Sequence, residues 1–259
     1  MFEIDEEMDA VLKKQAWENA IQGKAAEFKA KFPQRVALVG EEHIYEFIEY
    51  AMSKAKQYNM LADREINGLI ILMHNLGCDF DIDPQYPWAR LKLFPDKTFE
   101  EKEPESFLHL QKVYDQFLQF NEHTLGEDGA YLKAAQQRLR DKRLEDLRPF
   151  TDDNIVRSLR AIYPQRYDRI PEAVLRGPVM AAAHDKAFQY DLDPHAGKMV
   201  LAAMIFMHGI SVNLDPLCAY MHSFLDEAPV PGWHEHQLFY RFKLLAGAIL
   251  DDMKDPEEK

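Results

Sequence analysis

The sequence predicts an all-α protein made of two tandem, homologous antiparallel helical subdomains that arose by internal duplication and pack together. Glycine is scarce, with 11 residues in 259, and no alternating β-branched run extends beyond a few positions. Motifs also recur: Ala-Lys-Gln-Tyr-Asn-Met at 55–60 is followed 132 residues later by Ala-Phe-Gln-Tyr-Asp-Leu at 187–192. A repeat of this length indicates a whole helical subdomain.

Further matched positions define the two copies. Gly77 and Gly209 are 132 residues apart, and so are Asp83-Pro84 and Asp215-Pro216. Phe32-Pro33-Gln34-Arg35 and Tyr163-Pro164-Gln165-Arg166 are offset by 131. The predicted divisions are therefore a first copy at 1–124, a bridging helix at 125–148 and a second copy at 149–259. Because stops, caps and apolar faces repeat, the repeat predicts a scaffold and not a duplicated site.

In the first copy, the good helix formers Ala, Lys, Glu and Gln predict helix within 5–31. Apolar residues at three- and four-residue steps predict further helices over 41–58, 63–76 and 105–122. Pro33 is expected to end the first of them. Asp63 is expected to cap the third, and Gly77 to end it in a left-handed conformation. Asp83-Pro84 predicts another helix start, and a charged loop is expected over 91–104.

The second copy is expected to follow the same order. Thr151 should cap a helix that Pro164 closes, and Asp193 should cap another that Gly209 ends. The remaining expected segments are an amphipathic helix at 170–190, a proline-bearing loop at 227–232, a final helix at 233–253 and a charged tail to 259. The bridging helix is expected over 126–146.

The charge balance narrows the classes of partner. With 44 acidic and 31 basic residues the net charge is −13, which argues against nucleic-acid binding and against an anionic membrane surface. It favours a basic protein partner, although solubility alone also accounts for it. An acidic N-terminus without an apolar core predicts no signal peptide and a cytoplasmic location. Cys78 and Cys218 are expected to be buried free thiols.

Candidate chemistry is sparse, so we expect no enzyme activity, no metal and no cofactor. Asp79-Phe80-Asp81-Ile82-Asp83 resembles the start of a calcium loop, but Pro84 and Arg90 occupy the positions that need glycine and glutamate. His234-Glu235-His236 is a poor chelate on a helix. No nucleophile elbow or phosphate loop occurs, and no catalytic residue is assigned.

Unduplicated aromatic residues are the better candidates for partner contact, because large aromatics dominate interface energies. The predicted partner-binding residues are Asp79, Asp81, Tyr86, Trp88, Trp233 and Glu235. Arg35 and Arg166 are suited to binding a carboxylate or another anion, but pairing with an acidic residue of the same copy is the favoured interpretation.

One stretch resembles a known family. Its residues are Tyr58, Leu72-Met73, Leu76-Gly77, Asp79-Phe80-Asp81, Asp83-Pro84 and Pro87-Trp88-Ala89. They are similar to a helical module associated with bacterial type VI secretion gene clusters, in which Tyr-Gly-Ile is usual where this chain has Tyr58-Asn59-Met60. The resemblance covers residues 30–122 well and the second copy only in outline. It implies an accessory protein, either an adaptor or an immunity protein, and assigns no catalytic residue.

The leading functional hypothesis is therefore a non-enzymatic, cytoplasmic accessory of a type VI secretion effector cluster that binds a cognate effector or toxin, as an immunity protein or as an adaptor. The alternative is an effector or enzyme with a site in the cleft between the copies, lined by unduplicated polar residues such as His74, His184, His234 or Glu235. A purely structural helical subunit is a third interpretation.

Overall fold

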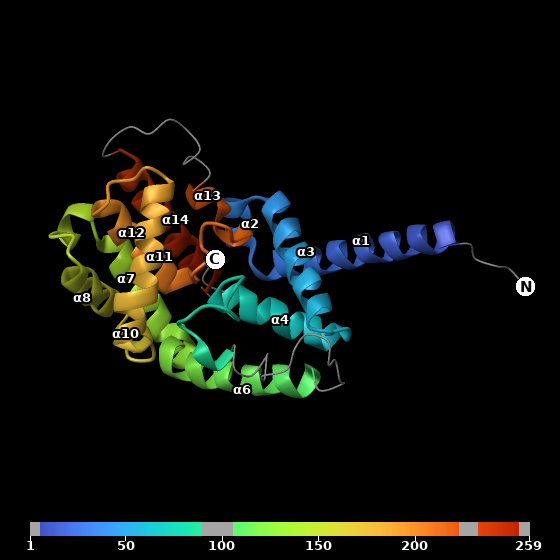
Figure 1. Cartoon of the computed structure of the whole chain (residues 1–259). Helices are drawn as coiled ribbons and strands as arrows, with labels where there is room; N and C mark the ends of the chain where they lie inside the picture. Colours follow the sequence, from blue (N-terminus) through green and yellow to red (C-terminus); the bar gives the residue numbers. More distant parts are fainter. Residues whose placement is uncertain (1–5, 90–105, 223–232, 254–259) are drawn as a thin grey trace, which may run out of the picture.

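The computed structural model describes residues 6–89, 106–222 and 233–253, which are helical with no β-strand among them (Figure 1). The loops expected over 91–104 and 227–232 and the tail beyond 253 lie outside the described residues. Within the described part, no helix combines the length and the apolar character needed to cross a bilayer. The all-α prediction is confirmed.

The N-terminal segment, residues 6–125, has helices close to those expected. They are α1 (Glu6–Lys31), α2 (Pro33–Val39), α3 (Glu41–Gln57), α4 (Asp63–Leu76) and α6 (Ser106–Leu125). Pro33 also begins α2, because proline at the first helical position gives up no intrahelical hydrogen bond. The cap predicted for Asp63 is wrong: Glu65 instead accepts the backbone N–H groups of Leu61 and Ala62, both at 2.9 Å.

The described part of the C-terminal segment, residues 130–222 and 233–253, contains eight α-helices. They are α7 (Ala130–Asp141), α8 (Asp152–Ile162), α9 (Pro164–Tyr167), α10 (Glu172–Val174), α11 (Met180–Gln189), α12 (Ala196–His208), α13 (Ala219–His222) and α14 (Trp233–Asp252). The helix expected over 170–190 contains a π-helical stretch at Leu175–Val179, where Pro178 has no N–H to donate. The bridging helix α7 is shorter than expected, since Gly129 before it is left-handed.

Two apolar clusters make up the core. One joins residues between Ala25 and Phe120 and also takes in Leu217; the other extends from Ala135 to Ala246. Helix α14 packs against α2, and α6 packs against α9, so the last helix of each segment contacts a proline-initiated helix of the other. The two segments thus hold each other along a shared interface.

Gly77 and Gly209 lie against each other in that interface. Their φ angles are +101° and +100°, a region that L side chains rarely adopt. A Cβ on Gly209 would lie 2.8 Å from the Leu76 carbonyl oxygen, and one on Gly77 would overlap the carbonyl oxygen of His208. Their ψ angles of 155° and 166° are extended, so the left-handed helical conformation predicted for Gly77 is wrong. Close backbone approach explains both glycines.

Asp83 and Asp215, the crossed aspartate pair, join the same two chain segments. Asp83 accepts the backbone N–H of Ile210 at 2.7 Å, and Asp215 accepts that of Cys78 at 3.1 Å. Each also accepts the backbone N–H two residues further on, at 2.8 and 2.9 Å. Each buried carboxylate therefore caps its own turn and holds the end of a helix from the other segment.

Another matched cluster surrounds two lysines. Lys54 binds Asp81 at 2.5 Å and Asp79 at 2.8 Å, whereas Lys186 binds Asn213. Tyr58 donates to Asp81, and the amide of Asn213 donates to Tyr190 at 3.1 Å. The residues that follow the tyrosines, Asn59 and Asp191, have φ angles of 56° and 50°, which asparagine and aspartate tolerate better than most residues.

Candidate functional site

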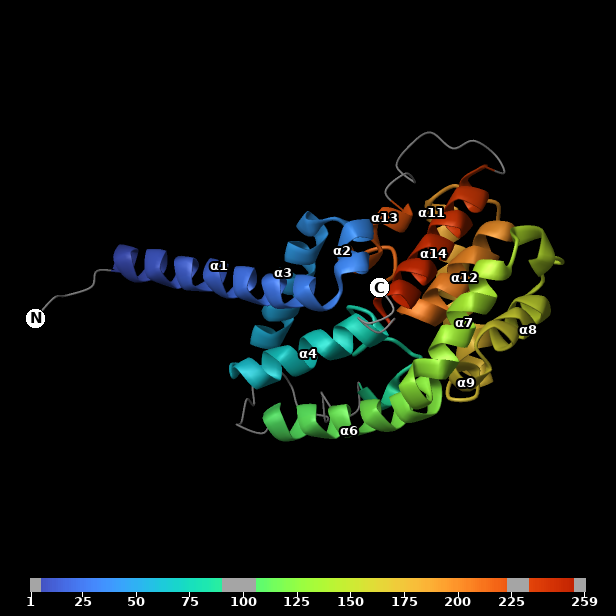
Figure 2. The same cartoon turned by 180° about the vertical axis from the view of Figure 1, so that it is seen from behind.

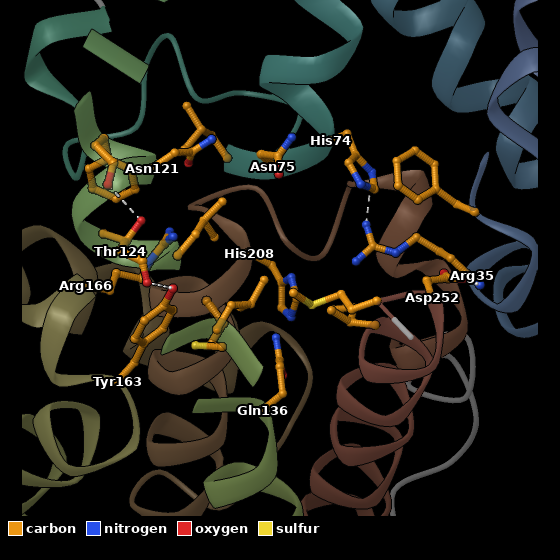
Figure 3. Close-up of a pocket in the computed structure, with 18 residues that line it drawn as sticks. Arg35, His74, Asn75, Asn121, Thr124, Gln136, Tyr163, Arg166, His208 and Asp252 are labelled. Carbon is orange, nitrogen blue, oxygen red and sulfur yellow. Dashed lines mark hydrogen bonds between the residues drawn. The ribbon is translucent and has the colours of Figure 1, made fainter. Parts of the chain in front are cut away.

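A cavity of about 240 Å³ lies between the two segments (Figure 3). Its walls come from α2, α4 and α6 of the N-terminal segment and from α7, α9, α12 and α14 of the C-terminal segment. The polar side chains that line it are Arg35, His74, Asn75, Asn121, Thr124, Gln136, Tyr163, Arg166, His208 and Asp252. The cavity is therefore lined by residues of both segments.

Arg35 and Arg166 are both buried beside this cavity, with exposed fractions of 8% and 5%. Arg35 Nη1 contacts His74 Nδ1 at 3.1 Å. Arg166 donates from Nε to the Phe206 carbonyl at 2.6 Å and from Nη2 to the Tyr86 hydroxyl. Neither guanidinium forms a salt bridge with any carboxylate of the described residues, so the predicted pairing with an acidic residue of the same copy is wrong.

His74 and His208 lie close to these charges. Burial, reinforced by the positive charge of Arg35, holds the pKa of His74 well below its usual range. Burial and the charges of Arg35 and Arg166 lower the pKa of His208 to about 3. Both imidazoles are therefore neutral at physiological pH.

Two buried polar atoms of the lining have no hydrogen-bond partner among the described residues. They are Nε2 of His208 and Oε1 of Gln136, a residue only 1% exposed. By contrast, Tyr163 donates its hydroxyl to the Thr124 carbonyl at 2.6 Å, which closes the wall there. Unpaired buried polar atoms cost roughly 1–3 kcal/mol each, so they indicate an interaction still to be made.

Comparison with protein-family models, curated proteins and solved structures finds no match to this chain. Function is therefore argued from the chain's own residues.

The residues predicted to bind a partner are dispersed in the structure. Asp81, Tyr86 and Glu235 are buried, and Glu235 accepts the backbone N–H of Asp193 at 2.5 Å. Asp79 is partly buried and accepts from the Tyr50 hydroxyl at 2.5 Å. In this conformation Asp81, Tyr86 and Glu235 are buried, and their hydrogen bonds are made within the fold.

The two predicted tryptophans differ in exposure. Trp88 packs against the rings of Tyr86 and Phe120 and is only partly exposed, whereas 44% of Trp233 is exposed. No structural observation tests whether either contacts a partner, so both stay predictions. Of the residues expected in the cleft, His74 lines the cavity; His184 is exposed on α11, and His234 and Glu235 are buried at the start of α14.

Helix α1 offers a different kind of surface. In two opposite views its N-terminal half projects away from the body of the molecule (Figures 1 and 2). Residues 10–16 are all exposed, and packing against the core begins only at Trp17 and Ile21. Met8, Val11 and Leu12 share one face of this projection and are 53%, 62% and 54% exposed.

Two pairs of residues in the structure, one of lysines and one of histidines, were not predicted from the sequence. Lys54 and Lys186 are offset by 132, like the glycines, but were not recognised as a pair. The 132-residue offset matches His74 with Phe206 and not with His208, yet both histidines line the cavity. The buried cysteines were predicted correctly, and both are free thiols.

Proposed function

We propose that this protein is a non-enzymatic accessory of a type VI secretion effector cluster, which binds a cognate effector in the cytoplasm as an immunity protein or an adaptor. The resemblance of residues 30–122 to the type VI helical module supports the proposed association with such a cluster. The projecting half of α1 is the observation that carries the binding role.

Length and exposure make α1 a recognition helix. Its 26 residues extend about 39 Å at 1.5 Å per residue, and only the C-terminal part packs on the body. An isolated helical stretch is marginally stable in water, so the projection gains stability from a surface that covers Met8, Val11 and Leu12. Helices with apolar residues at three- and four-residue steps bind in grooves of partner proteins.

The charge of the chain favours a basic effector over a second copy as the protein whose groove binds α1. At −13, two copies repel each other, whereas a basic effector is attracted. A nuclease toxin that acts in the cytoplasm has this character, because it must bind a polyanion.

We also propose that the scaffold arose by tandem duplication of one helical unit. The crossed aspartate pair, the facing glycines and the two lysine clusters occur at positions 132 residues apart, which supports this origin. In that arrangement the segment before α2 is equivalent to the short helix α8, so the projecting length of α1 is particular to the first unit.

Co-purification with the product of the neighbouring effector gene tests the proposal. We expect a stable complex, and about tenfold or greater loss of affinity for the double variant Val11→Asp/Leu12→Asp, because charges would enter an apolar contact. Leu61→Asp is the matched control, since Leu61 is 71% exposed outside α1 and its substitution should leave binding unchanged.

Two outcomes contradict the proposal. One is the absence of any complex with neighbouring effector or spike proteins. The other is a concentration-dependent dimer of the purified chain that the double variant abolishes, which would make a second copy the occupant of α1.

The alternative, an effector or enzyme with its site between the two segments, is favoured by one observation: the cavity contains neutral imidazoles beside buried guanidiniums. Toxicity when the chain is expressed alone would support this alternative. Protection of cells against a co-expressed toxin would support the immunity role.

A further inference from the structure

We propose that the cavity between the two segments binds a small molecule with an acidic group at each end, such as a dicarboxylate or a phosphorylated acid, held between Arg35 and Arg166. This inference concerns a ligand and is independent of the protein partner proposed for α1. The cavity, its two buried guanidiniums and its unpaired polar atoms carry it.

The first argument is the state of the arginines. A guanidinium has five N–H donors and no acceptor. Arg35 uses one of them toward His74, and its guanidinium makes no other hydrogen bond within the described residues. Burial lowers the pKa of the Arg35 guanidinium, which reflects the cost of holding that charge away from water. An anionic ligand removes this cost.

The carboxylates whose charges act on the two guanidiniums make no hydrogen bond with them, because they accept from backbone amides instead. Asp252 accepts the N–H groups of Gln34 and Arg35 at 2.9 and 3.0 Å, and so caps α2. Asp215 and Asp83, whose charges act on Arg35 and Arg166, are the crossed aspartate pair. Acidic groups thus lie near both arginines, but they accept hydrogen bonds from backbone amides and not from the guanidiniums.

The second argument is the supply of further hydrogen-bonding groups. Because Arg35 can only donate, the Nδ1 atom of His74 must accept, and the proton of that imidazole lies on Nε2. The unpaired Nε2 of His208 is a second donor when it carries the proton. The Gln136 amide can present either its oxygen or its nitrogen after a flip.

The third argument is geometry. Figure 3 shows Arg35 and Arg166 on opposite sides of the cavity with His208 between them, and both guanidiniums act on the charge of that imidazole. The lining contains two guanidiniums and one carboxylate, Asp252, so it is positive inside a protein of net charge −13. An elongated molecule with two acidic ends satisfies both arginines at once.

Calorimetry and thermal unfolding of the full chain with defined probes test the proposal. Succinate and phosphoglycolate are the two dianionic probes, acetate is the singly charged probe, and putrescine is a dication of similar length. We expect saturable binding and a raised Tm with at least one dianionic probe, weaker binding of acetate and none of putrescine. The dianionic probe that binds more tightly identifies carboxylate or phosphate as the second acidic group.

Arg35→Gln gives the decisive variant. Because it removes an unpaired buried charge, the ligand-free variant should unfold at a Tm no lower than that of the parent, yet bind the dianion about tenfold or more weakly. Arg169→Gln, at an exposed arginine outside the cavity, is the control and should bind as the parent does. NMR titration should also show that the probe raises the pKa of His208 from about 3, since it brings negative charge beside the imidazole.

The proposal is overturned if neither dianionic probe binds at millimolar concentration, or if the Tm shift persists unchanged in Arg35→Gln. It is equally overturned if Arg35→Gln lowers the Tm of the ligand-free protein by as much as a core substitution does, because Arg35 would then be a structural residue.

Discussion

At two positions of the shared interface, close backbone contact requires the residue to be glycine. Gly77 and Gly209 combine positive φ angles with a neighbouring backbone that leaves no space for a side chain. Their surroundings differ from those of Gly247 in α14, where an added Cβ would meet nothing within 4 Å. Glycines in one chain therefore range from required to replaceable.

Gly77→Ala should destabilise the protein by roughly 3 kcal/mol or more, since it combines backbone strain with overlap against His208. Gly247→Ala should stabilise it by about 0.5–1 kcal/mol, because alanine favours a helix interior. Urea denaturation of both variants measures the difference. Equal stabilities for the two variants would contradict the close packing described for Gly77.

At the scale of elements, helix ends are capped by distant residues as well as local ones. Phe32, at the N-cap of α2, gives no side-chain cap, and Asp252 at the end of α14 takes its place. Negative charge at a helix N-terminus also interacts favourably with the helix dipole. The last described helix thereby fixes the second one, more than 200 residues earlier in the chain.

Asp252→Ala should lower the free energy of unfolding by about 1–2 kcal/mol, the usual cost of losing an N-cap. Glu49→Ala, at an exposed position of α3, is the matched control and should change it by less than about 0.5 kcal/mol. Chemical denaturation followed by circular dichroism reports both values. A neutral Asp252→Ala would show that solvent replaces this cap.

Much of this element-level organisation could be predicted from the sequence. Pro33, Gly77 and the apolar periodicity placed most helix ends within a few residues, because the signals are local. A cleft between the copies with His74 in its lining was one of the predictions, but Arg35, Arg166 and His208 could not be placed in it, since they come from three other helices. Asp252 was equally hidden, because nothing near it in the sequence indicates which helix it caps.

For the whole molecule, the buried histidines link stability to pH. The pKa values of His74 and His208 are depressed in the folded state, whereas unfolded histidine titrates near 6.5. Below pH 6.5 the unfolded chain therefore binds more protons than the folded one. Stability is highest above that pH and declines progressively as the pH falls toward 3.

We expect His208 to lower the free energy of unfolding by roughly 1 kcal/mol per pH unit between pH 6.5 and 5, and His74 to act in the same direction, before most carboxyl groups titrate. Urea denaturation at several pH values measures the slope, and His208→Gln should reduce it. A free energy of unfolding that stays constant from pH 7.5 to 5 would contradict the neutral, buried state of the imidazoles.

The crossed aspartate pair has a consequence for synthesis on the ribosome. The Cys78 N–H finds its acceptor only at Asp215, and Asp83 accepts its second backbone N–H only from Ile210, in each case more than 120 residues later. The described helices of the N-terminal segment therefore leave the ribosomal tunnel before the Cys78 N–H has its acceptor and before Asp83 has its contact with Ile210. Domains usually fold in order from the N-terminus during translation. In this chain the first segment completes its hydrogen bonds only after most of the second has been made.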